Sequence, residues 1–188
     1  ENSSKYTRTH MKILAESKTL RIMAVHRSFP YILYPENMND FVEIRKIITH
    51  ARPTITYNSP ETVLLIYRSY MDAIRSGKRI EVIFEKESFD FHISLLRRWL
   101  TKSKFRSIIN GMIEKLKSNN LRVCVIDEYS PMEVDFSEKQ VCLSLNYVGV
   151  TNGIIISSRD AVSFMSQVFD EKVNRSQDVI SLLEAIKI

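Results

Sequence analysis

The stretch that decides the fold is Pro53–Phe84, with the sequence PTITYNSPETVLLIYRSYMDAIRSGKRIEVIF. Residues 59–76 carry apolar side chains at helical spacing, and they lie between two short strand-like segments, 54–57 and 79–84. Two strands joined by one helix of this length usually pair in parallel through a right-handed crossover. The stretch therefore predicts a β-α-β unit and an α/β fold.

The signals at the ends of the predicted helix agree with this assignment. Ser59 is a suitable N-cap, Pro60 suits the first helical position, and Glu61 lies in the positively polarised first turn. Gly77 suits the position just after the last turn. The helix therefore begins at the corner Asn58-Ser59-Pro60, directly after the first strand.

The same two periodicities predict the other elements. Alternating apolar residues indicate strands, and apolar residues three or four positions apart indicate helices. In chain order, the further elements are a strand over 19–26, helices over 36–51, 87–100 and 105–118, a strand over 121–126, short strands over 132–136, 140–147 and 153–157, and helices over 159–173 and 176–186.

Together these elements predict an α/β fold with a mixed, mainly parallel central sheet. Helices are expected on both faces, and the three short strands after Asp127 form a C-terminal antiparallel meander. Residues 1–35 are predicted to be a basic N-terminal arm or linker with a possible strand. Residues 36–188 are predicted to form the α/β domain.

The composition is that of a globular domain with one sizeable core. Of 188 residues, 44% are hydrophobic and 26% are charged, and four glycines leave no room for a Gly-rich phosphate loop. The net charge of +5, with a pI near 9.2, is compatible with nucleic acid or an acidic membrane face but requires neither.

The sequence favours a cytoplasmic location. It contains no apolar run of membrane-spanning length and no signal peptide. Cys124 and Cys142 lie in alternating apolar segments and are expected to be buried thiols on neighbouring strands, away from any zinc spacing. Because the sequence starts at Glu1 without an initiator Met, we expect a piece of a longer protein or a processed chain.

Polar residues follow three predicted strands and define a candidate ligand site. They are Asn58 and Ser59 after the first strand, Glu85 after the second and Asp127 after the third. Ligands of parallel sheets bind beyond the carboxyl ends of strands, and a helix starting at Ser59 would direct free N–H groups there, which favours an anion. The alternative is an ordinary capped helix, with charges that mark where strands leave the core.

Catalytic patterns are poor. The sequence has no Walker, dinucleotide-binding or nucleophile-elbow motif, and its histidines are scattered without metal-ligand spacing. His10-Met11-Lys12 matches the H-x-K core of phospholipase D-like phosphodiesterases, but Ser17 occupies the position where their pattern requires Asp. We therefore expect no catalytic residues, no metal and no cofactor.

A basic segment supports a different function. It lies around 97–106, contains no acidic residue, and has Trp99 and Phe105 interleaved with its cations. Cations contact phosphates and aromatic rings stack on bases, so this segment could bind nucleic acid. The alternative is a solvated corner between two helices, with Trp99 packed inward. The basic residues are Arg97, Arg98, Lys102, Lys104 and Arg106.

Two parts of the chain resemble known families. Glu43–Phe84, with GKRIEVI at its end, resembles the opening of phospholipase D-like domains. Asn119–Val173 is similar to the end of the effector domain of archaeal winged-helix transcription regulators, of the methanogenesis-regulator type and, more distantly, of the TrmB-type sugar-responsive regulators. The segments that match the outline of those tails are Val141–Gly149, Ile155–Ala161 and Val168–Phe169.

This resemblance implies a sensor and not an enzyme, because the matching region, like that of the regulators, has no H-x-K motif. It implies a phospholipase D-like fold that is catalytically silent, a small-molecule effector, a homodimer, and DNA contact through a winged-helix domain absent from this chain. Two alternatives remain open, namely a nucleic-acid-binding or nuclease-like module that uses the basic residues, and a non-catalytic dimerising scaffold.

Overall fold

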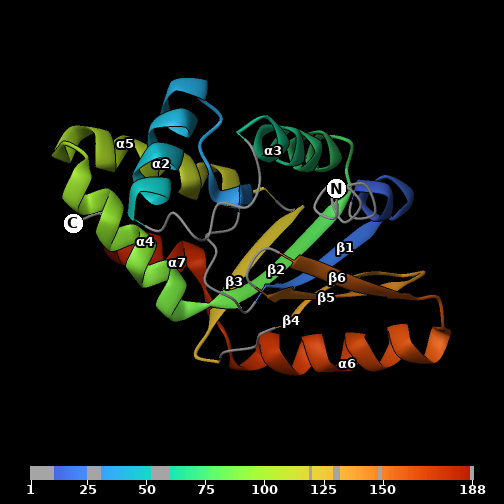
Figure 1. Cartoon of the computed structure of the whole chain (residues 1–188). Helices are drawn as coiled ribbons and strands as arrows, with labels where there is room; N and C mark the ends of the chain where they lie inside the picture. The colour runs from blue at the N-terminus through green and yellow to red at the C-terminus, as the bar shows by residue number, and fades with distance from the viewer. Residues whose placement is uncertain are drawn as a thin grey trace.

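A mixed β-sheet runs through the middle of the molecule (Figure 1). The computed structural model describes residues 11–24, 31–51, 60–118, 120–128, 132–147 and 150–186. Within them the sheet has seven strands in the order β6-β5-β4-β1-β2-β3-β7. The strands are β1 (Thr19–Ala24), β2 (Arg79–Glu85), β3 (Leu121–Ile126), β4 (Met132–Ser137), β5 (Val141–Tyr147), β6 (Val150–Ile156) and β7 (Gln177–Asp178).

Within the described residues, parallel pairing is confined to β1, β2 and β3. β2 pairs in parallel with β1 on one side and with β3 on the other, so that Val82 lies between Ile22 and Val123. β4, β5 and β6 continue from β1 as an antiparallel meander, and β7 pairs antiparallel with β3. The predicted α/β class, the mixed sheet and the C-terminal meander are confirmed.

One predicted pairing is wrong. Both neighbours of β2 are already taken by β1 and β3, so 54–57 is not its partner in the sheet; that segment itself lies outside the described residues. The strand predicted at 19–26 is β1, and it lies in the middle of the sheet. Long-range pairing has brought a strand from the predicted N-terminal arm beside β2.

Helices cover both faces of the sheet, but unequally (Figure 1). One face packs against α2, α3, α4, α5 and α7, and the other packs against α6. The bounds are α2 (Met38–Ala51), α3 (Pro60–Arg75), α4 (Lys86–Trp99), α5 (Lys102–Leu116), α6 (Arg159–Arg175) and α7 (Val179–Ile186), with a 3-10 turn, η1 (Tyr31–Leu33), before α2.

The alternation of strand residues produces two separate cores. On β2, Ile80, Val82 and Phe84 are buried beneath the larger helical layer, while Ile83 belongs to the core that α6 covers with Phe169. Gly77 ends α3 at a φ of 85°, a conformation that glycine adopts without strain. The predicted helix end is therefore confirmed.

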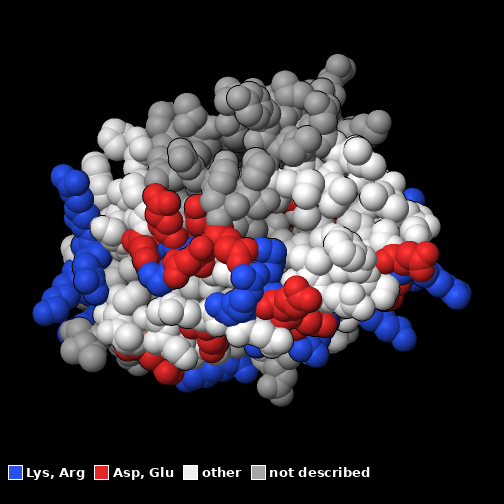
Figure 2. All heavy atoms as spheres, turned by 90° about the horizontal axis from the view of Figure 1, so that it is seen from below, with Lys and Arg blue, Asp and Glu red and all other residues white. Residues whose placement is uncertain are grey.

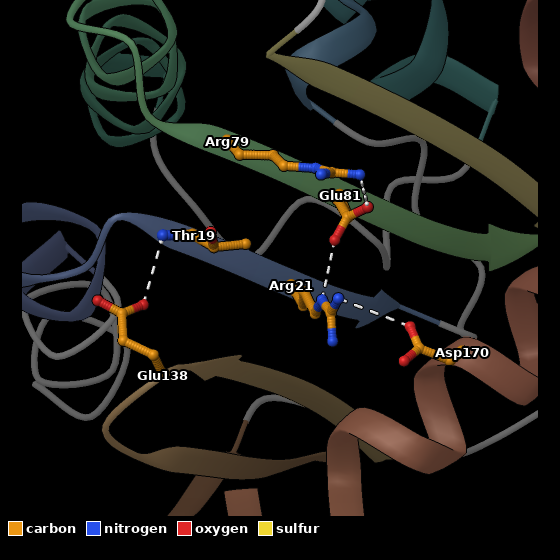
Figure 3. A network of polar contacts seen from close by, with 6 residues as sticks. All are labelled: Thr19, Arg21, Arg79, Glu81, Glu138 and Asp170. Atoms are coloured by element: carbon orange, nitrogen blue, oxygen red, sulfur yellow. Dashed lines mark hydrogen bonds and ion pairs between the residues drawn. The ribbon is translucent and has the colours of Figure 1, made fainter. Parts of the chain in front are cut away.

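A buried carboxylate on β2 links the sheet to α6 (Figure 3). Glu81 is 3% exposed, and its two oxygens accept hydrogen bonds of 2.8 Å from Nε of Arg21 and from Nη2 of Arg79. Arg21 also lies 3.6 Å from Oδ1 of Asp170, and its guanidinium is 5.1 Å from the ring centre of Phe169. Arg21 therefore holds β1, β2 and α6 together.

We predict a strong coupling between Arg21 and Glu81. Removing one partner leaves the other charge poorly solvated, so the double-mutant cycle of Arg21→Met and Glu81→Gln should give a coupling energy of about 2 kcal/mol in urea unfolding. The exposed pair Lys117–Glu114, also at 2.8 Å, is the control and should give less than about 0.5 kcal/mol. Equal coupling in the two pairs would contradict the structural role of Glu81.

A second buried charge ties α5 to its neighbours. Nζ of Lys115 donates to the backbone carbonyls of Ile32 and Tyr34, and to Oη of Tyr67 at 3.2 Å. Burial lowers the pKa of Lys115 to about 8. The same burial raises the pKa of Tyr67.

The lowered pKa of Lys115 predicts a pH-dependent stability. Between about pH 8 and the unfolded value of 10.5, the unfolded chain binds more protons than the folded one, so the free energy of unfolding should rise with pH. The gain attributable to Lys115 is about 1 kcal/mol between pH 8 and 9. Denaturant titrations at both pH values should show this gain relative to Lys115→Met; parallel curves for the two proteins would exclude it.

Candidate functional site

The structure brings two of the predicted ligand-site residues together. β2 and β3 are adjacent and parallel, and Glu85 lies opposite Ile126 in the register, so Asp127 follows immediately at the same edge. Asn58 and Ser59 lie outside the described residues. The described part of this site is therefore the carboxyl edge of β2 and β3, with Glu85 and Asp127.

Glu85 is buried although it carries a carboxylate. Its side chain is 6% exposed, and its Oε2 accepts a 2.9 Å hydrogen bond from the hydroxyl of Ser88. Ser88 and His92 lie one and two turns along α4, both buried, and Nδ1 of His92 donates to the carbonyl of Ser88. Glu85 precedes the first residue of α4, where the helix dipole favours negative charge.

The neighbouring charges divide into a paired group and an exposed one. Glu128 binds Lys172 and Arg175 in the last turns of α6, and the hydrogen bond from Lys172 lowers the pKa of Glu128. Asp127 is exposed. Lys86 donates a hydrogen bond to Asp90, and this hydrogen bond raises the pKa of Lys86. Asp127 is thus accessible to a ligand, while the next residue fixes α6.

A second group of buried polar residues was not predicted as a site. Asp135 on β4 is 1% exposed and Ser144 on β5 is 0% exposed, and the register places them on the face that carries the larger helical layer. Within the described residues, the hydroxyl of Ser144 has no hydrogen-bond partner. Burial, together with the charges of Asp135 and Glu133, raises the pKa of Cys142 to about 11.

The sequence contains a pattern that points to this group of buried polar residues. In the segment MEVDF, Val134 and Phe136 alternate with Glu133 and Asp135, so the acids must face one side of the sheet. A sheet covered on both faces buries them. The sequence does not say that this part of the sheet is covered, so the alternation alone does not predict that Asp135 is buried.

The basic residues gather where α4 ends and α5 begins. Arg98, Lys102 and Arg106 are exposed, as is Arg97, whose guanidinium lies 5.5 Å from the ring centre of Phe105. Lys104 differs, because it is paired with Asp40 and Glu43 of α2, and the hydrogen bond that it donates to Asp40 raises its pKa. We call the exposed residues Arg97, Arg98, Lys102 and Arg106, together with Trp99, the basic corner.

The expectation that Trp99 packs inward is wrong. Its side chain is 55% exposed, and its ring contacts His50 of α2 edge-on, with 5.4 Å between ring centres. Trp99 is the last residue of α4, and the buried face of that helix is already filled by Phe89, Ile93 and Leu96. The basic corner therefore presents an accessible aromatic ring among cations.

The described ranges contain neither a metal-binding cluster nor a membrane-spanning helix. No group of three or more His, Cys, Asp or Glu side chains there is arranged to hold a metal ion. Among the helices of the same ranges, none combines the length and the hydropathy of a membrane span.

Comparison with known proteins gives a structural likeness. No family model matches the chain, and no curated protein matches it. The fold is similar to that in "Structure of TrmBL2, an archaeal chromatin protein, shows a novel mode of DNA binding", with a TM-score of 0.49 and 12% identity. The match covers 93% of this chain and 50% of that one, so this chain spans half the length of that protein.

Proposed function

We propose that this chain is a ligand-sensing and dimerisation domain of a DNA-binding transcription regulator, without catalytic activity. The observation that carries the sensing part is the buried carboxylate of Glu85, at the edge of the sheet where parallel strands end. Within the described residues its side chain accepts one hydrogen bond, from Ser88, and a buried carboxylate is costly unless further donors, such as those of a ligand, are added. The resemblance of 119–173 to regulator effector domains supports the same function.

The described groups favour an effector that donates hydrogen bonds. Glu85 and Asp127 are both acidic, so a small molecule with amine or hydroxyl groups suits them better than an anion. The expectation of an anion rested on the helix start at Ser59, which lies outside the described residues. We therefore assign the effector to polyhydroxyl or amine-bearing small molecules.

A physical route leads from this site to α6. Asp127 is followed by Glu128, which is bonded to Lys172 and Arg175. A ligand that binds Asp127 would bias the position of the β3 end, and with it the last turns of α6. A shift between two α6 positions is the kind of population change through which an effector alters a dimer.

The test is a thermal-shift screen of sugars, polyamines and nucleosides. A ligand should raise the unfolding temperature, because it binds the folded chain alone. Glu85→Gln removes the charge at nearly constant shape and should weaken binding at least about tenfold. The control is Glu87→Gln, an exposed acid in the first turn of the same helix.

Two results would contradict the proposal. The first is a screen in which no compound class changes the unfolding temperature, or in which Glu85→Gln binds like the native chain. The second is hydrolysis of a phosphodiester substrate above the uncatalysed rate, because the proposal excludes catalysis.

A second candidate function rests on a different observation, the exposure of Trp99 within the basic corner. An accessible ring between cations is the arrangement that stacks bases and contacts phosphates. In this case the domain itself would bind nucleic acid, in addition to any DNA contact made elsewhere in a longer protein.

Trp99 provides its own readout, because it is the single tryptophan of the sequence. If the corner binds single-stranded nucleic acid, an oligonucleotide should quench the fluorescence, with an affinity that falls with salt by a slope near −0.7 per phosphate contact. Arg98→Gln with Lys102→Gln should weaken binding more than Lys12→Gln with Lys117→Gln, which removes the same charge elsewhere. Unchanged fluorescence at low salt would eliminate this function.

A further inference from the structure

The apolar surface of β6 and α6 carries large exposed side chains. We call it the β6–α6 patch, and its central residues are Ile154, Ile155 and Phe164. They are 65%, 50% and 62% exposed. α6, which carries Phe164, has a single fully buried residue, Phe169.

The patch lies in a part of the chain that is nearly free of charge. Between Gln140 and Phe169 only Arg159 and Asp160 are charged, although 26% of all residues in the chain are. Figure 2 shows the side of the molecule that carries α6; charged side chains gather in its middle and at its ends, with an uncharged area between them. Depletion of charge over an exposed surface is typical of the core of an interface.

The outer edge of β6 is also unprotected. β6 is the last strand on its side of the sheet, and no strand within the described residues pairs with that edge. The strand VTNGIII contains no Lys, no Pro and no charged residue, which are the usual devices that prevent edge strands from pairing. Its free backbone groups are therefore available to another strand.

The two isoleucines specify how this edge is covered. Ile154 lies opposite Leu143 and Ile155 opposite Cys142, and these two residues belong to the cores on opposite faces of the sheet. A partner that lies flat on one face would cover only one of them. A strand added at the edge brings side chains to both faces and covers both.

We infer that the β6–α6 patch is a two-fold interface with a second copy of this chain, formed by antiparallel pairing of β6 with its counterpart. A two-fold axis sets the same apolar edge against itself, so the surface is its own complement. The lack of charge offers nothing to nucleic acid or to a charged protein. α6, 17 residues and about 25 Å long, and β6 provide a surface on the scale of a standard interface.

This inference rests on the dimerisation part of the proposed function and names its surface. The test is sedimentation of the whole chain, which should form a dimer of twice 22.0 kDa. Ile155→Lys and Phe164→Lys should each weaken the dimer by roughly 100-fold or more, because each buries a charge at the interface. Leu65→Lys, which replaces a 56% exposed apolar residue on α3, is the matched control and should leave the dimer intact.

Hydrogen exchange supplies an independent readout of strand pairing. In the dimer, the β6 amides that point away from β5 should be protected, and this protection should disappear on dilution and in Ile155→Lys. At a concentration low enough for the native chain to be monomeric, the melting curves of all variants should match that of the native chain, because the substituted side chains are exposed in the monomer.

Three outcomes would overturn the inference. They are a chain that stays monomeric at high concentration, a dimer that survives both patch substitutions, and a dimer that Leu65→Lys dissociates as readily. The second outcome rejects this surface but keeps dimerisation. Conversely, a failed ligand screen with a patch-dependent dimer rejects sensing and keeps the interface.

Discussion

The structure depends on one buried charge, the carboxylate of Glu81 at the centre of the sheet. Burying a carboxylate costs several kcal/mol unless cations and hydrogen bonds offset the lost hydration. Arg21 from β1 and Arg79 from β2 itself supply both (Figure 3). Arg21 also lies against the rings of Phe136 and Phe169. The ion pair between Arg21 and Glu81 therefore fixes β1 beside β2, and the ring contacts fix α6 beneath them.

The position of α6 in turn links two regions that are otherwise far apart. Its last turns are bonded to Glu128 after the carboxyl end of β3, and its first half carries the exposed ring of Phe164. Phe169 is the one fully buried residue of α6, its other core contacts come from partly buried side chains, and its contacts with the sheet are partly ionic. A helix held in this way can move as a unit when a ligand changes one of its anchors, and that movement would reach the β6–α6 patch.

The sequence was informative where signals are local and silent where they are long-range. The Pro60 start and the Gly77 end predicted α3 almost to the residue, because capping depends on neighbours in the chain. The partner of β2 was predicted wrongly, because β1 lies some 60 residues earlier and only side chains such as Arg21 and Glu81 bring it back. Glu85 and Asp127 were placed correctly at one edge because parallel pairing of β2 and β3 follows from the helices between them.

Burial could not be predicted where an exposed residue continues the same apolar pattern as the buried residues of its helix. Trp99 continues the apolar face of α4 in the sequence, yet the helix ends there and the ring remains exposed.

With pairing through β6, two sheets of seven strands would join, and Figure 1 shows α4 and α5 at the end of the sheet opposite to β6. At a strand spacing of about 4.8 Å, the two basic corners would then lie roughly 60 Å apart. Two such corners could contact a long nucleic acid together but a short oligonucleotide only one at a time.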